Sequence, residues 1–299
     1  MYAICGATGN TGSVVAGRLL DAGQKVRVIG RRRDKLQPFV ARGAEAIVAE
    51  LTDHAALARA FGGVRAVYAM IPPDYGGDLR AFQAKVGDAL AAAIAEAGVS
   101  YAVSLSSIGA DKPGGTGPIA GLHEFEKKLD GAAGLNLLHL RPGYFFENLL
   151  AMIPVIRQTG TLAAAFRPDV PVAMVATRDI GARAADELLK LEFAGRSTRE
   201  LRAPRDYTFR EVARILGDAI GNPGLSYQQL PYEAFKEALV HMGFSKTTAA
   251  LLCEMTAAVN ERHVKALEPR SSENTTPTTL EQWAREVFAP AYQGKVATA

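Results

Sequence analysis

The sequence is short of the features that mark several classes of protein. Its 299 residues include only two cysteines, Cys5 and Cys253, which excludes a disulfide framework and a cysteine-based zinc pattern. Cys5 lies in an apolar run, so we interpret it as a small core residue rather than a redox group. There is no run of about 18 apolar residues, and the five histidines are scattered. We therefore expect no membrane span and no metal site.

The chain also lacks a large excess of charge of either sign. The formal net charge is +3 and the charged residues are dispersed, so nucleic acid is not an expected partner. The opening residues have the pattern of a strand rather than a charged-then-apolar signal segment, and we expect a cytoplasmic protein. Hydrophobic residues make up 48% of the chain, which is ordinary for a globular protein of this size, whose core needs no disulfides.

The first half of the chain alternates between short apolar runs and segments with helical periodicity. Six strand–helix repeats of this kind predict an α/β fold, with a doubly wound parallel sheet that has helices on both sides. Such a sheet binds its ligand at the carboxyl ends of the strands. The predicted strands are Tyr2–Cys5, Lys25–Ile29, Ala46–Val48, Ala66–Met70, Tyr101–Leu105 and Leu135–Leu140. The predicted helices between them are Thr11–Ala22, Asp34–Arg42, Asp53–Phe61, Leu79–Ala97 and Leu122–Ala132.

Beyond Arg141 the regular alternation fades. We expect a dinucleotide-binding domain over residues 1–150, with a returning segment near 172–195, and a smaller helix-rich substrate lobe over 151–299. Thr208 is a predicted N-cap, with Glu211 completing a capping box, and the chain after Gln293 is expected to fray. The predicted helices are Thr177–Leu191, Phe209–Ile220, Pro231–Met242, Ser245–Lys265 and Glu281–Phe288.

Three glycines stand at every third position of the turn after the first strand, in the sequence GATGNTG. Backbone N–H groups at a helix N-terminus bind a pyrophosphate when no side chain blocks its approach. Gly6 permits the sharp exit from the strand, Gly9 the approach of the phosphate, and Gly12 the close packing of the helix on the sheet. A plain glycine-rich turn is the alternative, but its place in the strand–helix alternation favours dinucleotide binding. Short polar residues that can add contacts are Thr8, Asn10 and Thr11.

The spacing G-x-x-G-x-x-G and the sequence GATGNTG resemble the atypical short-chain dehydrogenase/reductases, specifically the NmrA-like family. Similar stretches continue downstream as VRVIGRRRDK, ELTD, SSIGAD, LRPGYFFEN and DIGARAADELL. The resemblance implies a Rossmann fold, and it places Glu50 and Leu51 beside the adenine, although relatives often carry Asp where this chain has Glu50. It also implies that Met70, Ile71 and Pro72 line the middle of the cofactor, unless these residues only end the fourth strand.

The second predicted strand runs into Arg31, Arg32 and Arg33. An enzyme selective for NAD usually has Asp or Glu here, which binds the ribose hydroxyls, whereas a guanidinium binds a phosphate through two parallel hydrogen bonds. Arg31 follows Gly6 by 25 residues, where the ribose should lie. We therefore predict NADP(H) as the cofactor, with Arg31 as the first contact to its 2′-phosphate and Arg32 as the second. A solvated basic turn is the alternative.

The resemblance also implies where catalytic groups should stand. Typical short-chain dehydrogenases carry a Ser or Thr after the fifth strand and a Tyr-x-x-x-Lys pair on the next helix. Ser106 occupies the first of these positions, and Lys127 can take the lysine position, with contacts to the cofactor. His123 stands where the tyrosine is expected. Either His123 replaces the tyrosine as the proton donor, since imidazole titrates near neutral pH, or it lines the site and the acid is missing.

In relatives, the stretch after the sixth strand lies against the nicotinamide and the substrate. Tyr144 is therefore a predicted cofactor contact, and with Phe145 it either stacks on a flat substrate or packs between the lobes. We predict an NADP(H)-dependent oxidoreductase that transfers hydride to a small, flat, apolar acceptor, such as a quinone or a conjugated carbonyl. The alternative is a non-catalytic NADP(H)-binding redox sensor that acts through protein partners. A sugar epimerase or dehydratase is disfavoured by the missing tyrosine, and an oligomer is compatible with the sequence.

Overall fold

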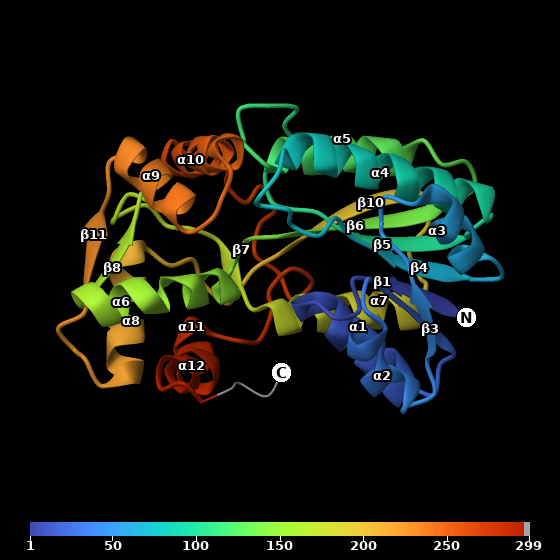
Figure 1. The fold of residues 1–299 in the computed structure, drawn as a ribbon, viewed down its shortest axis with the longest axis horizontal. Helices are drawn as coiled ribbons and strands as arrows, with labels where there is room; N and C mark the ends of the chain where they lie inside the picture. The colour runs from blue at the N-terminus through green and yellow to red at the C-terminus, as the bar shows by residue number, and fades with distance from the viewer. Residues whose placement is uncertain (296–299) are drawn as a thin grey trace.

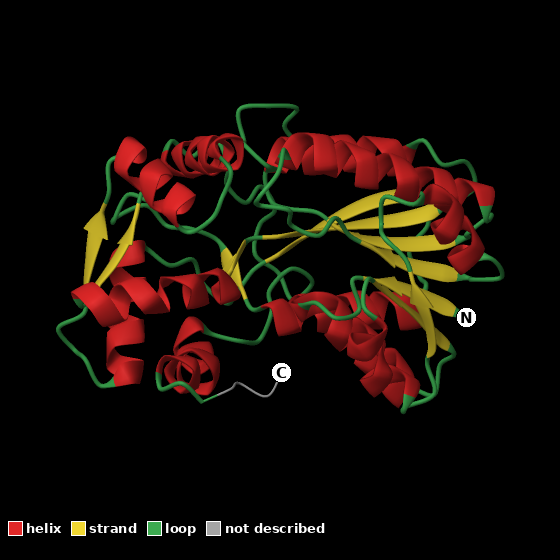
Figure 2. Ribbon diagram, in the orientation of Figure 1, coloured by secondary structure: helices red, strands yellow, loops and turns green. Residues whose placement is uncertain are grey.

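The computed structural model describes residues 1–295, so the end of the tail predicted to fray, residues 296–299, lies outside the described part. A seven-stranded sheet flanked by helices forms one lobe, and a smaller lobe built mainly of helices lies beyond the ends of its strands (Figures 1 and 2). None of the helices within residues 1–295 is long and apolar enough to cross a membrane.

The sheet is parallel throughout, in the order β10-β6-β5-β4-β1-β2-β3. The strand order reverses between β1 and β4, which is the point where a doubly wound sheet binds its ligand. The Rossmann-type α/β class predicted from the alternation is confirmed. The strands are β1 (Tyr2–Cys5), β2 (Val26–Gly30), β3 (Glu45–Val48), β4 (Ala66–Ala69), β5 (Tyr101–Leu105), β6 (Asn136–Pro142) and β10 (Arg196–Leu201).

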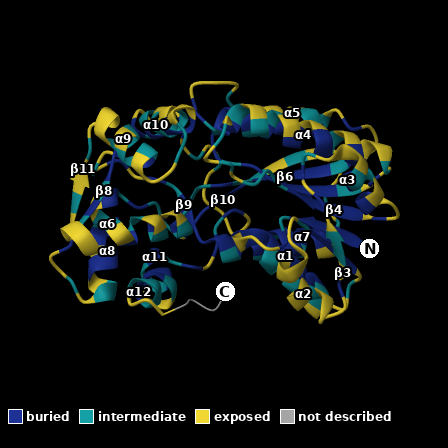
Figure 3. Cartoon of the chain, viewed as in Figure 1, coloured by how far each residue is buried: buried dark blue, intermediate teal, exposed yellow. Residues whose placement is uncertain are grey.

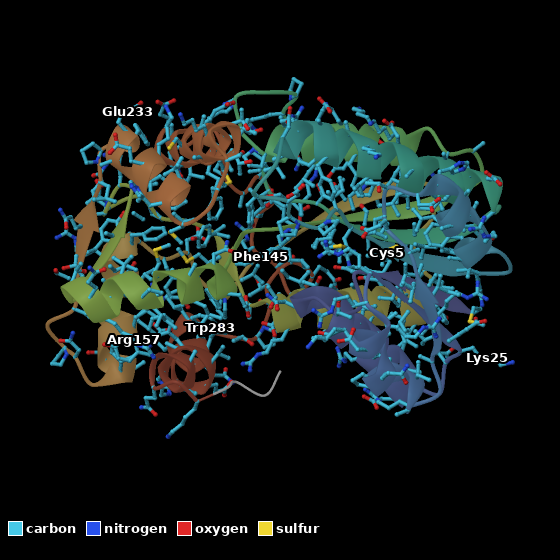
Figure 4. All side chains as sticks on the ribbon, in the orientation of Figure 1. Cys5, Lys25, Phe145, Arg157, Glu233 and Trp283 are labelled. Atoms are coloured by element: carbon cyan, nitrogen blue, oxygen red, sulfur yellow. The ribbon has the colours of Figure 1, made fainter. Side chains whose placement is uncertain are left out.

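Helices cover both faces of the sheet and bury its apolar side chains (Figure 3). One face carries α1 (Asn10–Asp21), α2 (Arg33–Val40) and α7 (Thr177–Lys190), and the other carries α3 (His54–Phe61), α4 (Leu79–Glu96) and α5 (Ile119–Asp130). Cys5 lies fully buried in β1, near the middle of the sheet lobe (Figure 4), and burial raises the pKa of its thiol to about 12. Such a thiol stays protonated, as expected of a core residue.

The seventh strand, β10, was not predicted. Its sequence, RSTREL, is mostly polar because β10 is an edge strand, hydrogen-bonded to β6 alone. The chain reaches this strand through α7, which packs tightly on α1. A Cβ atom on Gly181 of α7 would lie 2.6 Å from the Cβ of Val14 and 2.7 Å from the carbonyl oxygen of Thr11. Glycine at this position therefore allows α7 to support the first turn of α1.

The second lobe is built around aromatic side chains, among them Trp283 (Figure 4) and Tyr207, both fully buried. The predicted capping box of α8 (Phe209–Ile220), a helix of this lobe, is present, because Thr208 and Glu211 each accept a hydrogen bond from the other's backbone N–H. The strands of the second lobe are β7 (Tyr144–Phe145), β8 (Thr161–Ala164), β9 (Met174–Val175) and β11 (Ser226–Gln229). Its helices are a 3-10 helix (Phe146–Met152), α6 (Ile153–Thr159), α8 (Phe209–Ile220), α9 (Tyr232–His241), α10 (Lys246–Asn260), α11 (Leu280–Trp283), a π-helical turn (Ala284–Phe288) and α12 (Ala289–Tyr292).

Candidate functional site

The glycine turn between β1 and α1 leaves backbone donors free. Gly9 is the N-cap of α1 and provides no side-chain cap, and the first helical hydrogen bond runs from the Ser13 N–H to the Gly9 carbonyl at 3.0 Å. The N–H groups of Asn10, Thr11 and Gly12 precede that bond, so they lack a partner within the helix. Free N–H groups and the positive end of the helix dipole both favour an anion at this position.

Close packing fixes the shape of this turn. Gly6 has φ +63°, a left-handed conformation that glycine adopts without strain. A Cβ atom on Gly12 would lie 2.3 Å from the Gly6 carbonyl oxygen, and one on Gly6 would lie 2.7 Å from the Sδ of Met70. The carboxyl ends of β1 and β4 are therefore in contact across the switch point. Met70 packs against this glycine turn (residues 6–12), which we call the phosphate turn. Ile71 and Pro72 follow Met70 and are half-buried.

The side chains of the turn divide into two groups. Thr8 and Asn10 are exposed and can reach a bound molecule. The Thr11 hydroxyl is buried and accepts a hydrogen bond of 2.9 Å from the phenol of Tyr68, a fully buried residue of β4. Thr11 can therefore contribute its backbone N–H to a ligand, while its side chain holds α1 to the sheet. Sequence reasoning did not anticipate the contribution of Tyr68.

A cavity of about 910 Å³ lies beside the carboxyl ends of β2 and β3 and brings two predicted residues together, Arg31 and Glu50. Two further cations, Arg59 of α3 and Lys85 of α4, also line it, and sequence reasoning missed both. None of these three cations has an ion-pair partner within residues 1–295. Two carboxylates, Glu50 and Asp53, line the same cavity. The cavity therefore offers guanidinium and ammonium groups for a phosphate and carboxylates for the hydroxyl or amino groups of a nucleoside.

Two other residues predicted at this end take part in different contacts. Arg32 pairs with Asp34, at 3.0 Å between the guanidinium nitrogen and the carboxylate oxygen, and both side chains are well exposed. Leu51 is buried in the core between the sheet and its helices, with 8% of its surface exposed. A ligand could reach its backbone more readily than its side chain.

Ser106 follows β5 directly, at the carboxyl end of the sheet. Its hydroxyl is buried and has no hydrogen-bond partner among residues 1–295. A buried hydroxyl without a partner costs free energy, so this position is suited to a ligand that supplies one. Its neighbour in the strand, Ser104, differs, because its Oγ lies 2.6 Å from Nδ1 of the buried His139.

The two serines make a matched pair of substitutions. We expect Ser106→Ala to leave the melting temperature within about 2 °C and to weaken NADPH binding roughly fivefold to tenfold, since a hydrogen bond contributes about 1 kcal/mol. Ser104→Ala should instead lower the melting temperature and leave the affinity unchanged. Calorimetric titration and thermal unfolding measure the two effects. Loss of stability without loss of affinity in Ser106→Ala would contradict the assignment.

His123 and Lys127 share a second, smaller cavity of about 350 Å³, which lies between α5 and the edge strand β10. The Nδ1 atom of His123 lies 2.8 Å from the Ala110 carbonyl oxygen, and Lys127 is exposed. Arg196, Ser197 and Thr198 also line this cavity, and they pair with the first half of β6 rather than with its carboxyl end. The structure thus brings His123 and Lys127 to one cavity and does not bring Ser106 into it. Their catalytic roles stay predictions.

Tyr144 lies where the chain leaves the sheet for the second lobe, one residue before Phe145, which is labelled between the lobes in Figure 4. Its half-buried ring makes edge-to-face contacts with Phe166 and Phe209, with ring centroids at 5.5 and 6.0 Å. Burial raises the pKa of the Tyr144 phenol, and the neighbouring Tyr75 phenol adds to the shift. Tyr144 therefore stays protonated at neutral pH and belongs in part to the packing between the lobes.

The parallel sheet with its reversal point, the uncapped glycine turn and the basic cavity define a Rossmann-type dinucleotide-binding protein. A family model, the NmrA-like family, matches residues 2–284, and the chain belongs to this family.

Individual relatives are reductases by name. The chain is 34% identical over 241 residues, 80% of each protein, to (4-alkanoyl-5-oxo-2,5-dihydrofuran-3-yl)methyl phosphate reductase of Streptomyces griseus. It is 30% identical over 259 residues to quinone oxidoreductase 2 of Escherichia coli, covering 85% of this chain and 86% of that one. Among solved structures, an NADPH-dependent quinone oxidoreductase of Escherichia coli in complex with NADPH superposes with a TM-score of 0.82 at 26% identity, over 96% of this chain and all of that one.

Proposed function

We propose that the protein is an NADPH-dependent reductase that transfers hydride to a small conjugated acceptor, a quinone or a conjugated carbonyl compound. The observation that carries the proposal is the combination of an uncapped, glycine-lined helix N-terminus with a basic cavity beside the next strands. Relatives named as a quinone oxidoreductase and as a reductase of an oxo-dihydrofuran support the reaction class.

The residues present fit NADPH on three counts. The glycine turn offers free N–H groups for the diphosphate, and a side chain at Gly12 would displace the turn. Arg31 and its cationic neighbours suit a 2′-phosphate. The hydroxyl of Ser106 lacks a partner among the described residues, and it follows the carboxyl end of β5, the side of the switch point on which we expect the nicotinamide half.

NADPH, when bound, supplies a hydride, and reduction of a quinone to a hydroquinone consumes that hydride and one proton, which is taken up from solvent or from an acid. In our proposal, the phosphate turn holds the cofactor and Ser106 orients its reactive end. Tyr144, which keeps its proton at neutral pH, lines the acceptor side. A quinone needs little help from an enzyme acid, because its reduced oxygens take up protons from water readily.

Turnover of NADPH with an acceptor distinguishes the proposed reductase from a redox sensor. We expect NADPH oxidation with 2-methyl-1,4-naphthoquinone or 3-penten-2-one, followed at the absorbance of the reduced nicotinamide. Tight NADPH binding with no turnover on either acceptor would contradict the reductase and support the sensor. We propose further that the acceptor is flat and apolar, and that it is a quinone or an enone.

We expect His123→Ala to keep kcat within about threefold, because the side chain bonds to Ala110 in the cavity at the sheet edge. A general acid would contribute about a hundredfold or more, so a large loss of kcat with unchanged NADPH affinity would restore His123 as the proton donor. Lys127→Ala belongs in the same assay. A raised dissociation constant for NADPH supports the predicted ribose contact, and an unchanged one contradicts it.

A further inference from the structure

The loop of residues 71–78 leads from β4 to α4 and is hydrogen-bonded to the second lobe on its way. At its start, Met70 packs against Gly6. Near its end, the Ser245 N–H donates to the Tyr75 carbonyl at 2.8 Å, and the Ser245 hydroxyl donates to the Gly77 carbonyl at 2.7 Å. Ser245 is also the N-cap of α10, where its Oγ accepts from the Thr248 N–H. The loop is therefore held at both ends.

This arrangement fixes the ring of Tyr75. The ring stacks on Phe244, with centroids 4.7 Å apart and an interplanar angle of 29°. Although one face is covered in this way, Tyr75 remains 42% exposed. An exposed aromatic ring therefore lies in the loop that follows the carboxyl end of β4, at the edge of the sheet where a doubly wound fold binds its ligand.

An aromatic ring offers a planar apolar face on which the ring of a ligand can stack. Here the backbone hydrogen bonds and the stacking on Phe244 restrict the ring before any ligand binds, so a planar ligand would lose little further conformational entropy in stacking on it.

We infer that Tyr75, backed by Phe244, is a specificity-determining residue that stacks on the ring of the acceptor and selects planar, fused-ring acceptors over acyclic ones. This inference rests on the proposed function and narrows its substrate class. No local sequence pattern indicates this pair, because Tyr75 and Phe244 are separated by more than half of the chain and meet only in the folded protein.

The test compares two acceptors, 2-methyl-1,4-naphthoquinone and 3-penten-2-one, in three variants. We expect Tyr75→Ala to raise the KM for the naphthoquinone about tenfold and to change the KM for the acyclic enone and the Kd of NADPH less than twofold. Tyr75→Phe should behave as the natural protein, because stacking needs the ring and not the hydroxyl. Met242→Ala, at an exposed apolar residue close to Phe244, is the matched control and should change neither KM.

A second measurement does not depend on turnover. Calorimetric titration of the naphthoquinone into the protein saturated with NADP⁺ should give about tenfold weaker binding for Tyr75→Ala than for Tyr75→Phe. Equal effects on both acceptors, or equal binding by the two variants, would overturn the inference. If no acceptor were reduced, the proposed function would fail alone, and this titration would still decide the role of Tyr75.

Discussion

Replacing Gly12 with alanine is expected to destroy cofactor binding and much of the stability of the first lobe. The new Cβ atom would lie 2.3 Å from the Gly6 carbonyl oxygen and 3.1 Å from that of Cys5. Neither atom belongs to a flexible side chain, so α1 must move away from the sheet. We expect a loss of about 3 kcal/mol in the free energy of unfolding. We also expect at least a roughly hundredfold loss of NADPH affinity, since the N–H donors at the start of α1 would move with the helix.

A second glycine of the same helix provides the control. A Cβ atom on Gly17 would meet only the end of the Arg42 side chain, at 3.5 Å. Alanine is the better helix former by about 1 kcal/mol, so Gly17→Ala should be neutral or stabilising and should bind NADPH normally. Urea unfolding and calorimetric titration measure both variants. Normal affinity in Gly12→Ala would show that the turn does not hold the diphosphate.

The Arg31→Ala variant is expected to bind NADPH roughly 30-fold to 160-fold more weakly and NADH nearly as well as before. A charge-assisted contact to the 2′-phosphate contributes about 2–3 kcal/mol, and NADH lacks that phosphate. Arg31 lines the cavity beside β2 and β3 and has no ion-pair partner among the described residues, so its guanidinium is free for this contact. The ratio of the two dissociation constants, measured by titration, isolates the effect.

Arg33 offers a comparison of the same charge. It is exposed, begins α2 and does not line the cavity, so Arg33→Ala should change both affinities by less than about twofold. Binding of 2′,5′-ADP against 5′-ADP separates the adenosine end from the rest of the cofactor. Equal losses for NADPH and NADH in Arg31→Ala would refute its assignment to the 2′-phosphate.

The sequence predicted the first six strands of the sheet closely because their residues are apolar on both faces, as strands between two helical layers must be. The element boundaries near Gly23, Gly43 and Gly98 also followed, since each of these glycines has a positive φ after a helix. The strand β10 was not predicted because most of its residues are polar. Its outer neighbours are loop residues such as Leu267 and Glu268, whose N–H groups donate to the Glu200 carboxylate, so a polar sequence is compatible with its place.

The candidate site was predictable only where it lies in one stretch of chain. The phosphate turn and Arg31 follow strands whose carboxyl ends meet, so sequence position indicated their place in space. Spacing along a helix was less informative for His123 and Lys127, because it cannot tell which side of the helix faces the strand ends. Residues that reach a site from elsewhere, such as Lys85, leave no local pattern at all.

The path of the chain between the lobes has a consequence for the way such proteins diversify. The chain leaves the first lobe after Pro142, returns to it with α7 at Thr177, and leaves it again after Leu201. The outgoing strand β7 and the returning strand β9 are hydrogen-bonded to each other, and the Ala203 N–H donates to the Met174 carbonyl. Exchange of the whole second lobe between relatives by recombination would need three breakpoints within one small hydrogen-bonded crossing. New acceptor preferences are therefore expected to arise mainly by point substitution and loop change, at positions such as Tyr75.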